Sequence, residues 1–153
     1  MNHTPNLFCR RVLLALLLSA GLVDGRALAQ TASCTKADFE SVVDQAASTL
    51  RDFNVKNTGV FQGKLRALKQ KRSWSNDQFM QEGAAYVRDD RIIAFDEQTE
   101  DLLQRLNAAG TVQGAKPDCG LLAELRETMA ALVETQRSKW TYMFAKVDAE
   151  LAR

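Results

Sequence analysis

The fold depends on two stretches, CTKADFESVV at residues 34–43 and DCGLLAELRE at residues 118–127. Each places a cysteine, Cys34 or Cys119, immediately before the start of a helical pattern. The third cysteine, Cys9, lies in a predicted export signal, so two remain in an oxidising compartment and allow a single intramolecular pair. We therefore predict a Cys34–Cys119 disulfide; the alternatives are free thiols or an intermolecular bridge.

Residues 1–29 predict export. A basic start precedes an apolar run at 12–23, which is too short to span a bilayer as a helix. The sequence Ala-Leu-Ala at 27–29 has the small-x-small pattern of a signal peptidase site, so we expect cleavage before Gln30. General secretory and twin-arginine export both stay open. Residues 30–153 are expected to form a single helical-bundle domain, periplasmic or secreted, with no membrane span after cleavage.

Apolar residues recur every three or four positions through the mature chain, which predicts an all-α fold. We expect a small bundle of four to five helical segments with a long C-terminal helix and one disulfide. Asn54, Asn57 and Gly59 are expected to end the first helix, and Arg88–Arg91 interrupts a later apolar stripe. The predicted segments are 36–54, 59–72, 75–88, 92–106 and 119–152.

Helix starts carry local capping signals. Thr35 has Asp38 three residues on, and Ser75 has Gln78 at the same spacing, so each pair can form a capping box. Asp118 precedes the last helix. At the interruption, either Asp89 or Asp90 caps a new helix or one long helix runs through with a kink, and local propensity does not decide between them. Trp74 and Phe79 occupy hydrophobic-staple positions, which favours a structural role for Trp74 over ligand stacking.

The predicted disulfide constrains the topology. Because both cysteines precede their helices, the first and last helices should run parallel, whereas a four-helix up-down-up-down bundle makes them antiparallel. An additional reversal at Arg88–Asp90 would resolve this conflict. The alternative is that residues 59–72 extend or cross the first helix without reversing. The last helix is expected to outlast its neighbours, so that its second half protrudes or packs on another chain.

Absent residue types exclude several kinds of chemistry. His3 is the only histidine and lies in the signal, so the mature chain has no Ser-His or Cys-His nucleophile and no histidine metal ligand. There is no haem-attachment or phosphate-loop motif. We expect no cofactor, no metal site and no catalytic residue. Twenty basic and 19 acidic residues nearly balance, which gives no bulk attraction to nucleic acid.

Two charged clusters allow a functional and a structural interpretation. The first is a candidate anion-facing patch, although a solvated helix face explains it as well. The second is a set of carboxylates that could form a weak cation site or a general-acid pair, or a solvated face paired with the first cluster. The patch comprises Lys64, Arg66, Lys69, Lys71 and Arg72; the carboxylates are Asp89, Asp90, Asp96, Glu97, Glu100 and Asp101.

An aromatic row in the last helix is a candidate partner surface. It consists of Trp140, Tyr142 and Phe144, with Lys139 as a rim charge. Aromatic residues are enriched in the cores of protein interfaces, but a broad buried face is the structural alternative.

The function that these features favour is binding. We expect an exported binding, adaptor or envelope accessory protein without catalytic activity. Its partner would be another envelope or secreted protein, or a second copy in a homo-oligomer. The alternatives are a carrier of an apolar, lipid-like ligand between helices and, least favoured, an acid–base enzyme without histidine.

Overall fold

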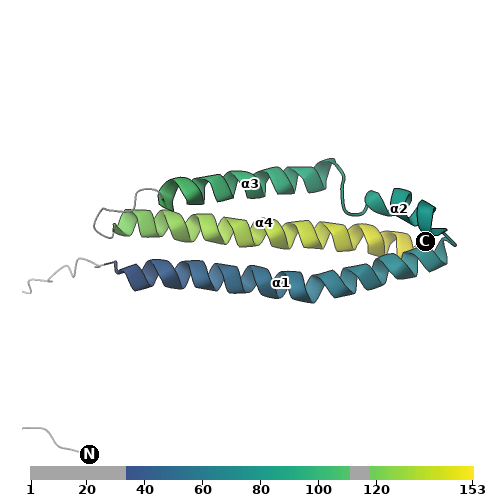
Figure 1. Cartoon of the computed structure of the whole chain (residues 1–153), viewed down its shortest axis with the longest axis horizontal. Coiled ribbons are helices and arrows are strands. Elements are labelled where there is room, and N and C mark those ends of the chain that lie inside the picture. The colour runs from purple at the N-terminus through teal and green to yellow at the C-terminus, as the bar shows by residue number, and fades with distance from the viewer. Residues whose placement is uncertain (1–33, 111–117) are drawn as a thin grey trace, which may run out of the picture. The chain divides into compact units, whose positions relative to one another are not determined.

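The structure, a computed structural model, describes residues 34–110 and 118–153 (Figure 1). The predicted signal at 1–29 lies outside the described residues. Over the described ranges the fold is all-α, as the periodicity predicts. No helix there is long and apolar enough to cross a membrane. The four helices are α1 (Lys36–Lys71), α2 (Asn76–Ala84), α3 (Asp90–Gly110) and α4 (Cys119–Ala152).

Helix α1 is continuous, so the predicted break between two helices at 54–59 is wrong. Asn54, Asn57 and Gly59 all lie inside it. A glycine in a helix interior costs about 1 kcal/mol relative to alanine. Packing outweighs that cost, because Ala46 before the predicted break and Phe61 after it are both buried. The alternative, in which residues 59–72 extend the first helix, is confirmed.

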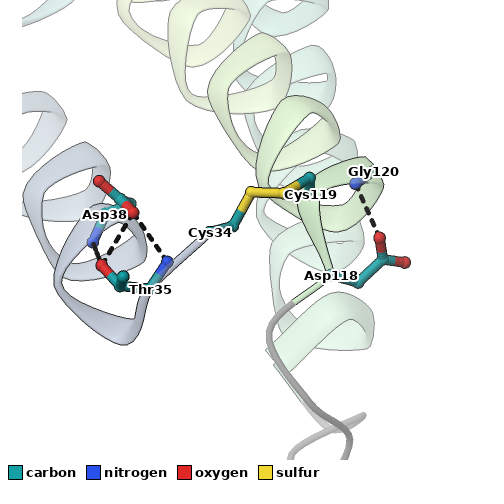
Figure 2. Close-up of a disulfide and its surroundings, with 6 residues drawn as sticks. All are labelled: Cys34, Thr35, Asp38, Asp118, Cys119 and Gly120. Atoms are coloured by element: carbon teal, nitrogen blue, oxygen red, sulfur yellow. Dashed lines mark hydrogen bonds between the residues drawn. A yellow bond between two sulfur atoms is a disulfide. The ribbon is translucent and has the colours of Figure 1, made fainter. Parts of the chain in front are cut away.

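The start of α1 has the predicted capping box, which Figure 2 shows. The Thr35 N–H donates to Asp38 Oδ2 at 2.8 Å, and the Asp38 N–H donates to Thr35 Oγ1 at 3.3 Å. Each side chain thus satisfies a backbone donor that the helix leaves without a partner. The Thr35 hydroxyl also donates to Asp38 Oδ2.

The end of α1 is a Schellman motif without glycine. Ser73 adopts a left-handed conformation, with φ of 54°. Its N–H donates to the Gln70 carbonyl at 3.1 Å, and the Trp74 N–H donates to the Lys69 carbonyl at 3.0 Å. These bonds turn the chain sharply. Ser75 then begins α2 with the predicted capping box to Gln78.

Helix α4 lies between α1 and α3 and packs on both (Figure 1). The cluster of buried residues takes Phe61 from α1, Ile92 from α3, and Met143 and Val147 from α4. This packing overturns the prediction that the second half of α4 protrudes or packs on another chain. With 34 residues, α4 is longer than α3, which has 21, but it is not longer than α1, which has 36.

The disulfide joins Cys34 and Cys119 at the starts of α1 and α4, with their Cα atoms 5.3 Å apart (Figure 2). The two helices run parallel, as predicted: Asn54 of α1 lies beside Trp140 of α4, and further along both helices Lys64 pairs with Asp148. Next to the bridge, the Asp118 side chain caps α4 by accepting the Gly120 N–H at 2.8 Å.

Helix α3 runs antiparallel to α4, because Asp89 pairs with Lys146 while the later Thr99 contacts the earlier Gln136. The chain therefore turns once between α1 and α3 and once between α3 and α4. Two turns suffice to bring Cys119 back to Cys34. The helix does break between α2 and α3, a point that the sequence left open. The additional reversal predicted at 88–90 is wrong, because the continuity of α1 removes the need for it.

Candidate functional site

The most connected polar group is the carboxylate of Asp89, at the start of α3. Its Oδ1 accepts the Ile92 N–H at 2.8 Å, so it caps α3 as one of the two predicted candidates. Its Oδ2 accepts the Tyr142 hydroxyl at 2.9 Å and the Lys146 ammonium. Lys146 also donates to the Ala85 carbonyl at 2.6 Å. Both carboxylate oxygens are thus occupied.

This cluster shifts the pKa values of its members. Burial alone would raise the pKa of Asp89, but hydrogen bonds from Lys146, the Ile92 N–H and Tyr142 outweigh it and hold the pKa at about 2. The hydrogen bond to Asp89 and burial raise the pKa of Tyr142. The carboxylate stays ionised at neutral pH and the phenol stays protonated. This arrangement fastens α3 and the end of α2 to α4.

The remaining carboxylates of the cluster do not converge. Asp96 pairs with Lys139 of α4, and Asp90, Glu97, Glu100 and Asp101 are exposed on α3. Within 34–110 and 118–153, no group of side chains could hold a metal ion. The alternative in which these carboxylates pair with the basic patch is not seen among the described residues, where their two ion pairs to other helices are with lysines of α4.

The structure separates the residues of the predicted partner surface. Trp140 and Phe144 face α1, where their ring centroids lie 5.9 and 5.5 Å from that of Phe61. Tyr142 and Lys139 face α3 instead. All four side chains are half-buried in these two seams. They therefore do not form one continuous face, and a contact with a partner stays a prediction.

Most of the predicted anion-facing patch is engaged within the chain. Lys64 pairs with Asp148 at 2.5 Å, and Arg72 pairs with Glu150. Lys71 donates to the Leu151 carbonyl at 2.7 Å. These three cations join the C-terminal half of α1 to the end of α4.

Arg66 and Lys69 differ from the rest of the patch. Neither has a carboxylate partner among the described residues: Lys69 donates to the neutral Asn76 Oδ1 and lies 5.5 Å from the centre of the Phe79 ring. Both line an open depression of about 420 Å³, which we call the α1 depression. Its lining residues are Arg66, Lys69, Gln70, Ser73 and Trp74.

A second open depression, of about 290 Å³, lies over the start of α3. Charged side chains dominate its lining, which consists of Val87, Arg88, Ile93, Asp96, Glu97 and Glu100. Neither depression offers the enclosed apolar space that a lipid carrier needs.

Sequence reasoning missed the partners that α4 supplies. No role is predicted for Asp148 or Glu150, yet they pair with Lys64 and Arg72 in the C-terminal part of α1. A usable signal was present for α1. If the bridge joins parallel helices at a separation of 85 residues, side chains about that far apart should be neighbours. The pair Lys64–Asp148, which is 84 residues apart, fits that rule.

Comparisons of the whole chain with family models, with curated proteins and with solved structures find no match.

Proposed function

We propose that this chain is an exported helical-bundle protein that acts by binding, as an adaptor or envelope accessory factor, without catalysis. The observation that carries the proposal is the α1 depression. There Arg66 and Lys69 have no carboxylate partner in the described part of the chain and lie beside Trp74. Uncompensated cations next to an aromatic side chain favour contact with an anionic group of a partner or ligand.

The acid–base alternative receives less support from the same structure. A general acid or base works best with a pKa near the operating pH. The pKa of Asp89 is about 2, and both of its oxygens are occupied by partners within the chain. Asp96 is paired with Lys139 and more than half exposed. Both carboxylates are therefore engaged by lysines of α4.

A crosslinked pull-down from the cell envelope tests the binding role. The bait carries a photo-crosslinking residue at Gln70, which lines the α1 depression. We expect a Lys69→Gln/Arg66→Gln variant to lose the captured species. The matched control is Arg51→Gln/Lys56→Gln, which removes the same charge from exposed positions of the same helix. Equal capture by both double variants would contradict the proposal.

The predicted partner surface needs a separate arm. Because Trp140 and Phe144 pack on Phe61, alanine at either position should lower the melting temperature whether or not it weakens capture. Lys139→Ala is more informative, since its ion pair with Asp96 is partly exposed and contributes little to stability. Lost capture at unchanged melting temperature would support a surface there, and unchanged capture would reject Lys139 as its rim charge.

Export has its own measurement. The mature protein isolated from the envelope or the medium should begin at Gln30. An N-terminus that retains the apolar run at 12–23 would contradict the predicted cleavage.

A further inference from the structure

We propose that the α1 depression binds the phosphate group of a phosphomonoester. This inference names a site and a ligand class for the binding role proposed above, and it rests on that role. The volume of about 420 Å³ exceeds what a phosphate group alone would fill, which leaves room for the organic part of an ester.

The helix brings the lining together. Arg66 lies three residues before Lys69 and four before Gln70, so these three side chains lie near one face of α1, and Ser73 follows just beyond the end of the helix. The left-handed Ser73 then turns the chain, and the Trp74 N–H binds the Lys69 carbonyl at 3.0 Å. This turn places the indole beside the same face.

No ion pair in the described part of the chain involves Arg66 or Lys69, the two cations of the site. The carboxylates of Asp148 and Glu150 on α4 pair with Lys64 and Arg72, which do not line the depression. Between positions 52 and 77 the sequence contains no acidic residue. Arg66 and Lys69 are three residues apart and repel each other, and a bound anion would relieve that repulsion.

The donors suit phosphate better than carboxylate. A guanidinium, an ammonium, an amide and a hydroxyl line one depression, and together they offer more donors than the two oxygens of a carboxylate can use. A phosphomonoester presents three strong acceptor oxygens and up to two negative charges. Trp74 adds a flat apolar surface for the ester group.

Calorimetric titration of the folded mature protein with phenyl phosphate tests the site. We expect saturable binding that weakens with added salt. Arg66→Gln and Lys69→Gln should each weaken it about tenfold, because each removes one charge-assisted contact. Arg51→Gln/Lys56→Gln should leave it unchanged. Trp74→Leu should weaken binding of phenyl phosphate more than binding of inorganic phosphate. Circular dichroism verifies that each variant is folded.

A vesicle arm distinguishes a lipid headgroup from a soluble ester. If the protein sediments with phosphatidylcholine vesicles that contain phosphatidic acid, and the Arg66→Gln variant does not, the phosphate belongs to a lipid. Phenyl phosphate binding without sedimentation assigns it to a soluble ligand. No saturable binding of phenyl phosphate at millimolar concentration and no Arg66-dependent sedimentation would overturn the inference. If partner capture at Gln70 still depended on Arg66 and Lys69, the binding role would survive without the phosphate site.

Discussion

Replacing Asp89 with asparagine should lower the free energy of unfolding at neutral pH. The change removes the negative charge of the carboxylate to which both Tyr142 and Lys146 donate hydrogen bonds. Asparagine is nearly isosteric and is itself a good N-cap, so the bond from the Ile92 N–H at the start of α3 can persist. The loss therefore reports the electrostatic link between α3 and α4 and not the cap.

The pKa of Asp89 sets the size of this loss. Burial opposes the ionised form, but the hydrogen bonds of the cluster lower the pKa from 3.8 to about 2. That difference corresponds to about 2.4 kcal/mol. Because the side chain is 26% exposed, solvent screening reduces the expected loss to about 1 to 2 kcal/mol. The folded pKa lies below the unfolded one, so this stability is present above about pH 5 and disappears as the pH falls toward 2.

Urea unfolding of wild type and Asp89→Asn between about pH 7 and pH 2 measures the effect. The difference in the free energy of unfolding should shrink as the wild-type carboxyl takes up its proton. Asp90→Asn is the matched control, because Asp90 is the adjacent carboxylate and is exposed. A difference that stays constant with pH, or an equal loss in the control, would refute the role assigned to the cluster.

Three further changes test other parts of the fold. Replacing Cys34 and Cys119 together by serine should lower the free energy of unfolding by about 4 to 5 kcal/mol, because the unfolded chain regains the entropy of a loop closed across 85 residues; a loss below about 1 kcal/mol in urea titration would contradict this account. Gly59→Ala should raise the free energy of unfolding by about 0.5 to 1 kcal/mol, since an added Cβ meets nothing within 4 Å. A lower melting temperature in this variant would argue against a continuous α1. Burial raises the pKa of Tyr86, and a hydrogen bond to a carboxylate raises that of Tyr142. Both tyrosines should therefore ionise at higher pH in the folded protein than in urea, and the free energy of unfolding should fall as the pH rises through the range in which they ionise. If ultraviolet difference absorbance shows the same tyrosine titration in the folded and the urea-unfolded protein, the shifts are refuted.

The local features of the fold could be predicted. The capping boxes of Thr35 and Ser75 depend on side chains three residues apart, so a short stretch contains all the necessary information. The apolar stripe of the last helix is equally local, and its members Leu122, Leu132 and Val147 are buried as expected. The bridge is predicted by counting the cysteines that remain after the predicted export signal, and it in turn predicts the parallel arrangement of α1 and α4.

The candidate site was predicted only in part. The basic run on α1 was visible, but the sequence could not show which of its cations lack a partner. Lys64 and Arg72 are neutralised by carboxylates 84 and 78 residues away, whereas Arg66 and Lys69 are not. The sequence favours a structural role for Trp74 at the start of a helix, because its place beside these cations depends on the left-handed turn at Ser73.

Residue types and their spacing are sufficient for the helical class, the helix starts and the bridge between Cys34 and Cys119, since each depends on neighbours along the chain or on a count. The continuity of α1 through Gly59 depends on tertiary packing. Apart from proline, single-residue helix propensities differ by no more than about 1 kcal/mol, whereas burial of one side chain such as Phe61 against α4 contributes about 1.5 to 3 kcal/mol. Where the two disagree, contacts between distant residues outweigh local preference.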